Sequence, residues 1–407
     1  MTGLRGPATA FAPILVTAAL VTTALAGCGS THASGTGPPA IPAIPSLATS
    51  AGYPDGTYAV LVMGGSAATH NNFWQVFVRP SGKQAAWRLA TPLGVASNGG
   101  IAVAATGGPS LVAALLPSQD LRFSPLSRTT DNGSTWTADG LLDTPLAAAP
   151  SALGAAPSGG LIALTRSGAA EVASHAGAAW ARLATARSLA SSPAGRSCGL
   201  TSLTAAGYTA SGAALLAGTC ARGGHAGIFA RAAGGGWTAT GPALPAALAG
   251  RPVAVLQLAR TGSAEVALLQ AGTGRTASLL GAWSTDNGGS WRLSAPYPLA
   301  GAQPRSAAVA GQALGVLLGN ADGTTAHGTK VSAITVTGPG AAWQALPTLP
   351  AGTAALPAGA VTLAAGPAGG FQLLSARLSR MSVWAAGSSG WSRSQVIKVS
   401  IPYGSSG

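Results

Sequence analysis

The sequence predicts an all-β fold, a β-propeller of four-stranded blades, for three reasons. Only 8% of the 407 residues are charged, against roughly 25% in an average soluble domain, so the outer faces of long amphipathic helices cannot be covered. Short apolar runs alternate with turns that use many of the 59 glycines and 28 prolines. Tryptophans recur about every 50 residues, a period typical of repeat folds. We expect seven blades, with six or eight as alternatives.

The tryptophan repeat defines the units of the fold. Each unit contains short apolar runs separated by turns at spacings of roughly 8–12 residues, as in propeller blades. The first unit has no clear apolar run before Tyr58, so we expect residues 395–401 to supply its missing strand. This pairing would close the ring and remove free sheet edges. The repeated tryptophans are Trp87, Trp136, Trp180, Trp237, Trp291, Trp343 and Trp391.

Two turns share a longer motif. Residues 129–136 (TTDNGSTW) and 284–291 (STDNGGSW) both fit Ser/Thr-x-Asp-x-Gly-x-Ser/Thr-Trp. The Asp side chain can accept hydrogen bonds from backbone N–H groups ahead of it, and Asn-Gly supplies the positive φ angles of a tight turn. The motif resembles the Asp-box (BNR) repeat of sialidase-like β-propellers, in which these residues are structural. The matching residues are Thr129, Asp131, Gly133, Thr135, Trp136, Ser284, Asp286, Gly288, Ser290 and Trp291.

The N-terminal residues predict export and a lipid anchor. Arg5 precedes an apolar run, and Leu-Ala-Gly-Cys at residues 25–28 resembles the bacterial lipobox. We expect residues 1–27 to be a lipoprotein signal peptide and Cys28 to carry the lipid, which places the protein on the extracytoplasmic face of the cell membrane. A single transmembrane anchor with an incidental cysteine is the alternative.

This prediction also sets the domain boundaries. Residues 28–55 are rich in Gly, Pro and Ser and are predicted to form a tether. Residues 56–407 are predicted to form the propeller domain. The formal net charge of +13 comes from scattered bases rather than from a dense block. Nucleic acid is not an expected partner, because the protein is exported.

The two remaining cysteines are predicted to form a disulfide. Cys198 precedes the first apolar run of the fourth unit, and Cys220 ends the second run. The start of one strand lies opposite the end of the next in a hairpin, so the two thiols would meet, and exported proteins are oxidised. The alternative, a redox or metal pair, has no supporting histidine or third cysteine. No cofactor or metal is expected.

The family resemblance implies a sialidase site, which the residues support poorly. Such a site uses three arginines, a Tyr–Glu pair and an Asp acid/base. The nearest match to the first arginine is Arg79, displaced by one position, and a one-residue shift in a strand turns a side chain to the opposite face. The only glutamates are Glu171 and Glu265, and neither Tyr208 nor Tyr297 is clearly placed to pair with one.

We therefore expect a non-catalytic, lipid-anchored, monomeric propeller that binds a protein or glycan partner. The alternatives are an extracellular glycoside hydrolase of the exo-sialidase type, and an assembly or sensor factor for a membrane complex. Three arginines facing a Tyr–Glu pair at the channel mouth would favour the enzyme, and a lining of Ala, Ser, Thr and Gly would favour the binding protein. The arginines expected along one rim are Arg79, Arg122, Arg166 and Arg231.

Overall fold

The structure, a computed structural model, describes most of the chain after residue 45. The described residues are 46–53, 56–63, 73–82, 85–92, 101–115, 124–142, 150–165, 167–175, 177–320, 331–353, 356, 359–377 and 380–398. All of them belong to one unit of the chain, Ile41–Gly407. The predicted signal peptide, Cys28 and residues 29–45 of the predicted tether lie outside the described residues.

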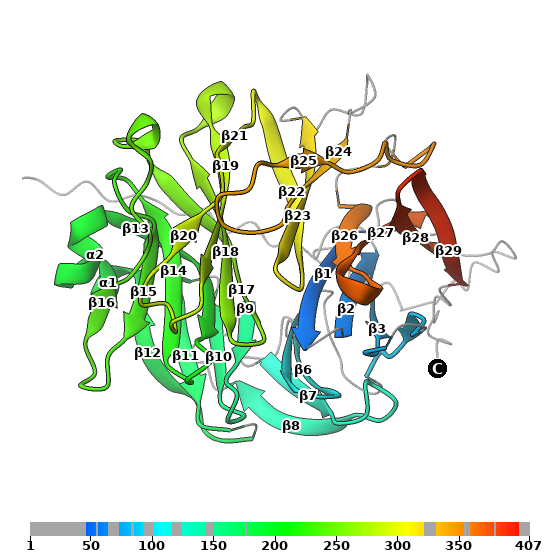
Figure 1. Cartoon of the computed structure of the whole chain (residues 1–407). Coiled ribbons are helices and arrows are strands. Elements are labelled where there is room, and N and C mark those ends of the chain that lie inside the picture. The colour runs from blue at the N-terminus through cyan, green and yellow to red at the C-terminus, as the bar shows by residue number, and fades with distance from the viewer. Residues whose placement is uncertain are drawn as a thin grey trace, which may run out of the picture. The chain divides into compact units, whose positions relative to one another are not determined.

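The described chain is a succession of four-stranded antiparallel meanders in a β-propeller arrangement (Figure 1). The first three consist of β1 (Ser46–Tyr53), β2 (Gly56–Met63), β3 (Phe73–Arg79) and β4 (Arg88–Leu89); β5 (Ile101–Gly107), β6 (Ser110–Leu115), β7 (Ser124–Thr129) and β8 (Thr137–Leu142); and β9 (Pro150–Ala155), β10 (Leu161–Thr165), β11 (Ala169–Ala173) and β12 (Ala181–Thr185).

The remaining four meanders complete the described fold. They consist of β13 (Leu200–Tyr208), β14 (Ala214–Cys220), β15 (Gly227–Arg231) and β16 (Trp237–Ala239); β17 (Val253–Thr261), β18 (Ala264–Ala271), β19 (Ser278–Ser284) and β20 (Arg292–Leu293), with β21 (Tyr297–Pro298) beside β19; β22 (Ala302–Ala310), β23 (Ala313–Asn320), β24 (Ser332–Val336) and β25 (Gln344–Ala345); and β26 (Val361–Ala365), β27 (Phe371–Arg377), β28 (Arg380–Gly387) and β29 (Gly390–Lys398). We refer to the seven meanders as units 1 to 7.

The predicted β-propeller of four-stranded units is confirmed, but the seven units do not form seven sheets. Five units are separate four-stranded sheets, whereas units 4 and 5 belong to one nine-stranded sheet. They are joined because β14 pairs with β17 through Thr219 opposite Ala254 and Cys220 opposite Val253. The first strands of neighbouring units contact one another around the whole ring, from β1 through β5, β9, β13, β17, β22 and β26 back to β1.

The first unit is completed by its own N-terminal strand. β1 pairs with β2 in an antiparallel register, and Figure 1 shows blue β1 beside orange β26. The expected pairing of residues 395–401 with this unit is wrong, because β29 pairs with β28 in unit 7. The described sheet structure therefore includes Ser46–Tyr53, which lies inside the segment that we expected to be tether.

Two short helices between units 3 and 4 are the main departure from β structure. Thr185 caps α1 (Ala186–Ala190) by accepting from the Ser188 N–H at 3.0 Å. Ser192 caps α2 (Pro193–Cys198), and Gly199, with a φ of 65°, ends it in the left-handed conformation that glycine favours. No helix in the described part of the chain is long and apolar enough to span a membrane.

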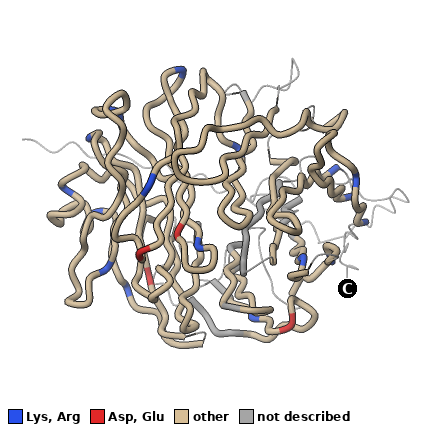
Figure 2. The backbone as a smooth tube through the Cα atoms, viewed as in Figure 1, with Lys and Arg blue, Asp and Glu red and all other residues tan. Residues whose placement is uncertain are grey.

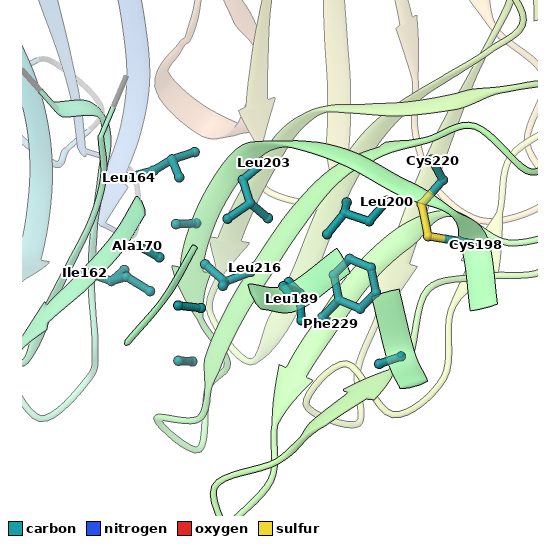
Figure 3. Packing of buried hydrophobic residues seen from close by; sticks show 14 residues of the cluster. Ile162, Leu164, Ala170, Leu189, Cys198, Leu200, Leu203, Leu216, Cys220 and Phe229 are labelled. Atoms are coloured by element: carbon teal, nitrogen blue, oxygen red, sulfur yellow. A yellow bond between two sulfur atoms is a disulfide. The ribbon is translucent and has the colours of Figure 1, made fainter. Parts of the chain in front are cut away.

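The predicted disulfide is confirmed. Cys198 at the end of α2 is bonded to Cys220 at the end of β14, with Cα atoms 5.3 Å apart. Figure 3 shows the disulfide at one end of a buried cluster that includes Leu189 of α1, Leu200 and Phe229. The bond therefore fixes the helical insertion to the core between units 3 and 4.

Four of the seven repeated tryptophans connect neighbouring units through hydrogen bonds. The indole N–H of Trp136 donates to the Ala90 carbonyl at 2.7 Å, that of Trp343 to Ala295 at 3.0 Å and that of Trp391 to Pro347 at 2.8 Å. In each case the acceptor follows the last strand of the preceding unit. Trp87 closes the series by donating to Gln372 of unit 7 at 2.8 Å.

The other three repeated tryptophans are placed differently. Trp180 packs at the edge of the buried cluster of units 2 and 3. Trp237 lies beneath the guanidinium of Arg231, 5.5 Å from the ring centroid. Trp291 donates to Gly288 in its own turn at 3.2 Å. The period of the tryptophans thus reflects contacts between units in most positions.

Candidate functional site

The two Asp turns have the same hydrogen-bond network. Asp131 Oδ1 accepts from the Thr129 hydroxyl at 2.7 Å and the Thr135 N–H at 2.9 Å, and Oδ2 accepts from the Thr135 hydroxyl at 2.7 Å. Asp286 accepts in the same way from Ser284 at 2.8 Å and from the Ser290 N–H and hydroxyl at 2.8 and 2.6 Å.

The backbone of these turns explains the residues after each aspartate. Asn132 and Asn287 have φ angles of 58° and 59°, and the following glycines have 84° and 76°. A Cβ at Gly133 would also lie 2.5 Å from the Ala90 Cβ of unit 1. Asn-Gly is therefore required here by turn geometry and by close packing.

Hydrogen bonding keeps both aspartates charged. The Thr135 N–H and hydroxyl hold the pKa of Asp131 far below its usual value. The Ser290 hydroxyl and N–H lower the pKa of Asp286 to about 2. A carboxylate that is fully ionised and bonded within its own turn is a poor proton donor. These two aspartates stabilise turns and are not candidates for acid catalysis.

A depression of about 770 Å³ lies where the turns after the first strands converge. Its lining comes from six of the seven units and is mostly small and neutral. Unit 5 contributes the two-residue turn between β17 and β18, where Gly262 has a φ of 59°. Thr261, Ser263, Thr285 and Gln312 add hydroxyl and amide groups, and Arg260 is the charged residue among the lining residues. We call this depression the mouth.

A smaller pocket of about 100 Å³ shares Arg260 with the mouth. Its lining includes residues of β5, β9, β13 and β17, the first strands of four consecutive units, so it lies inside the ring that these strands form. Alanine, glycine and leucine make up most of this lining. The polar side chains are those of Tyr58, Tyr208, Arg260 and Glu265. We call this space the inner pocket.

Arg260 and Glu265 are the charged pair of the site. They lie directly opposite each other in the β17–β18 register, on either side of the turn. Glu265 is buried, with 1% of its surface exposed, and its Oε1 accepts from the Ala210 N–H at 2.9 Å. Its buried Oε2 lies on the side of Ser284, the residue opposite it in β19, whose hydroxyl donates to Asp286 and also acts on the Glu265 carboxylate.

Burial shifts the pKa values of both Arg260 and Glu265. It raises the pKa of Glu265, and the Ala210 N–H, the N–H of Glu265 itself, the Ser284 hydroxyl and the Arg260 charge oppose the rise. Burial lowers the pKa of the half-buried Arg260, and the Glu265 charge opposes that change. Among the described residues no hydrogen bond or ion pair engages the Arg260 guanidinium. Arg260 and Glu265 therefore compensate each other's charge at the site.

The hydroxyl groups of the two tyrosines in the inner pocket form hydrogen bonds with backbone carbonyls. The Tyr208 hydroxyl donates to the Leu161 carbonyl at 3.0 Å, and the Tyr58 hydroxyl donates to the Val103 carbonyl. Burial raises the pKa of Tyr208 to about 12. A phenol with a raised pKa and a bonded proton is a weak nucleophile at neutral pH.

The arginines expected along one rim are not gathered there. Arg79 is fully buried and donates to Thr57 at 3.0 Å and to the Ala365 carbonyl at 3.1 Å, which links units 1 and 7. Arg231 lies over Trp237 near β16. Arg122 and Arg166 lie outside the described residues. The expectation is wrong for Arg79 and Arg231. The Arg79 guanidinium is buried and the Arg231 guanidinium stacks on Trp237, so both are bound within the fold and do not line a rim.

Arg260 was not predicted from the sequence to be a site residue. The available signal was weak: Arg260 and Glu265 flank a Thr-Gly-Ser-Ala turn between two apolar runs in a chain with only 9 acids. Figure 2 shows few acidic positions and basic positions spread over the described trace. In the described part of the chain, no group of three His, Cys, Asp or Glu side chains is arranged to hold a metal ion.

No protein-family model matches the chain. No curated protein matches it either. Several solved structures have a similar fold. YCF48 from Cyanidioschyzon merolae is 16% identical, with a TM-score of 0.44 over 86% of this chain and 95% of that one.

Two further structures extend the comparison. YCF48 bound to a D1 peptide is 14% identical, with a TM-score of 0.39 over 89% of this chain and 100% of that one. The six-bladed fungal lectin from Aleuria aurantia is 11% identical, with a TM-score of 0.41 over 88% and 97%. At sequence identities this low, the similarity concerns the fold alone. The class that the sheets define is a β-propeller.

Proposed function

We propose that the protein is a lipid-anchored, extracytoplasmic β-propeller that binds a protein or glycan partner at the mouth and is not an enzyme. The observation that carries this proposal is the lining of the mouth, which is built of small, neutral turn residues from six units with Arg260 as its charged side chain. Turns carried on a stiff ring of sheets form a rigid binding surface.

The same lining argues against the glycoside hydrolase alternative. Glycoside hydrolysis usually needs two carboxyl groups on opposite sides of the scissile bond. Among the residues that line the mouth and the inner pocket, Glu265 is the one that carries a carboxylate. A sialidase site needs three arginines around a Tyr–Glu pair, whereas these two spaces contain Arg260 and no second arginine among their lining residues.

We further propose that the two Asp turns are Asp-box repeats. Their support is the matching set of hydrogen bonds around Asp131 and Asp286, together with the shared spacing of residues. In this proposal the relationship to sialidase-like propellers concerns the scaffold. The site chemistry differs, because the lining residues of the two described spaces include one arginine instead of three and no aspartate.

The partner site is tested by cross-linking from two ends of one strand. In one variant a photoreactive amino acid replaces Ser263, which precedes β18 at the mouth. In the control variant it replaces Thr273, which follows β18 and is also exposed. We expect a specific adduct in intact cells from position 263 and none from position 273. Equal adducts from both positions would contradict a partner site at the mouth.

Catalysis and anchoring are tested separately. We expect no turnover of fluorogenic sialosides or other glycosides above the buffer rate; turnover that disappears in Glu265→Gln would identify an enzyme instead. Replacement of Cys28 by Ala should release the protein from the membrane fraction, because the proposed lipid attaches at that thiol. Retention of the Cys28→Ala protein in the membrane would favour a transmembrane anchor.

A further inference from the structure

We infer that the end of the ring opposite the mouth docks on an anionic lipid surface, so that the mouth is turned away from the membrane. The inference rests on the proposed anchoring for its location, because a lipid on Cys28 would hold the ring close to a bilayer. It goes beyond that proposal by naming the protein surface and the lipid chemistry that meet.

The direction of the strands defines the two ends of the ring. The turns after the first strands of six units line the mouth, so in these units the first strand runs toward the mouth and the second runs away from it. In unit 5, β17 ends at Thr261 of the lining, and β18 ends at Ala271, opposite Val253. We call the end where first strands begin and second strands end the far end. The nine residues of β17 separate the two ends by about 30 Å.

The far end carries exposed basic side chains from several units. Arg222 follows β14, and Arg275 follows β18, and both of these are second strands. In unit 7, β27 ends at Arg377, and the register places Arg380 opposite Arg377 and Lys398 opposite Arg380. The exposed bases of the far end are Arg196, Arg222, Arg275, Arg377, Arg380 and Lys398.

Contacts join the arginines of units 4 and 5 into one row. Arg222 Nη1 donates to the Arg196 carbonyl at 3.5 Å. The next residue, Gly223, packs on the neighbouring turn so closely that a Cβ there would lie 2.5 Å from the Arg251 nitrogen. Arg251 Nη1 in turn donates to the carbonyl of Thr276 at 2.5 Å. The resulting row consists of Arg196, Arg222, Arg251 and Arg275.

The acids whose side chains the structure describes do not offset this row. Asp131 and Asp286 lie in turns after third strands, at the mouth end, and Glu265 follows the turn between β17 and β18. Glu171 is buried in β11, with 2% of its surface exposed. Residues 172–264 include seven arginines and no aspartate or glutamate. Exposed guanidinium groups without nearby carboxylates suit lipid phosphates, which arginine can bind through two parallel hydrogen bonds.

The chain also enters the ring at the far end. β1 runs from Ser46 to the turn before Gly56, and Gly56 lines the mouth. Residues 29–45, a stretch of 17 residues, separate Ser46 from Cys28. A flexible chain of this length spans about 20–25 Å on average, which is less than the distance between the two ends. A lipid on Cys28 would therefore lie nearer the far end than the mouth.

The test measures which end of the ring meets the lipid. The full chain with its anchor is placed in vesicles of phosphatidylcholine, either alone or mixed with phosphatidylglycerol. A fluorescent amino acid replaces Thr273 at the far end or Ser263 at the mouth, and lipids with a spin-labelled headgroup act as quencher. In the anionic vesicles we expect strong quenching at position 273 and background quenching at position 263. The difference should shrink in pure phosphatidylcholine and at high salt, because salt screens exposed charges.

A pair of double variants assigns the effect to the row. Arg222→Gln/Arg275→Gln should bring quenching at position 273 toward its level in pure phosphatidylcholine, because each lost arginine weakens the attraction by about fivefold. The matched control is Arg182→Gln/Arg292→Gln. It removes the same charge from exposed positions on β12 and β20, near the mouth end, and should be quenched like the unmodified protein.

Three results would overturn the inference. The first is equal quenching at positions 263 and 273 in anionic vesicles. The second is a preference for position 273 that is independent of lipid charge and salt, because the tether would then orient the ring without the arginines. The third is a specific protein or polymer adduct from position 273 in cells without lipid-dependent quenching, which would assign the row to another anionic partner.

The comparison of the two lipid compositions needs no arginine variant, so it decides the question even if a double variant does not fold. Failure of this inference leaves two results of the proposed function intact. They are the adduct from Ser263 and the release of the protein by Cys28→Ala.

Discussion

Gln395 makes two hydrogen bonds to the backbone of Trp87 and so joins the last strand of the ring to the first unit. Its Oε1 accepts from the Trp87 N–H at 2.9 Å, and its Nε2 donates to the Trp87 carbonyl at 2.7 Å. Residues at the C-terminal end of the chain thus do reach the first unit, but through a side chain and not through strand pairing.

This contact predicts the effect of Gln395→Ala. The substitution should lower the free energy of unfolding by about 1–3 kcal/mol, because two partly buried hydrogen bonds are lost and the Trp87 backbone groups lose their partners. Denaturant unfolding measures the change. Gln344→Ala is the control, since Gln344 is exposed on β25 and forms no side-chain hydrogen bond within the described structure. An equal effect at both positions would contradict a special role of ring closure.

The inter-unit indole bonds predict a difference between two tryptophans. Trp343→Phe removes the bond from unit 6 to the Ala295 carbonyl of unit 5, whereas Trp291→Phe removes a bond within one turn. We expect Trp343→Phe to cost about 0.5–1 kcal/mol more in stability, because the lost bond joins two units, while the Ser294 hydroxyl still donates to the Ala295 carbonyl. Denaturation curves of the two variants would refute this expectation if they coincide.

The disulfide predicts sensitivity to reduction. Cys198 and Cys220 enclose a separation of 22 residues, and cross-links of this size usually stabilise a fold by about 2–4 kcal/mol. The double variant Cys198→Ala/Cys220→Ala should unfold at a lower denaturant concentration, by that amount. Reducing agent should shift the unmodified protein in the same direction and leave the double variant unchanged. A shift of the double variant by reductant would point to another cause.

The Asp286 turn predicts a pH-dependent contribution to stability. The pKa of Asp286 is about 2 in the folded protein, below its ordinary value of 3.8. A lowered pKa stabilises the fold above the unfolded value, and this stabilisation is lost as the pH falls from about 4 toward about 2.

Asp286→Asn should therefore unfold at a lower temperature than the unmodified protein at neutral pH, and the difference should shrink over that acidic range. Thermal unfolding across a pH series measures it. A difference that is equally large at neutral pH and below a pH of about 2 would show that the ionised carboxylate is not its source.

The sequence by itself determined the class of fold, the disulfide and the two Asp turns. Each depends on residues that are close in the chain or repeat with a fixed period: tryptophans about 50 residues apart, Cys198 just before the β13–β14 hairpin and Cys220 at its end, and Asp131 within four residues of its donors. Turn residues and apolar periodicity can be recognised in the sequence without knowledge of the fold.

Only the tertiary structure decided how the ring is assembled and where its site lies. β1 completes the first unit, although its residues were predicted to form part of a tether. Units 4 and 5 share one sheet because two residue pairs join β14 and β17. Arg260 lines the inner pocket together with residues of three other first strands, β5, β9 and β13, and Arg79 donates to the Ala365 carbonyl of unit 7. These relations join segments far apart in the chain, so packing between units fixes them and no local pattern encodes them.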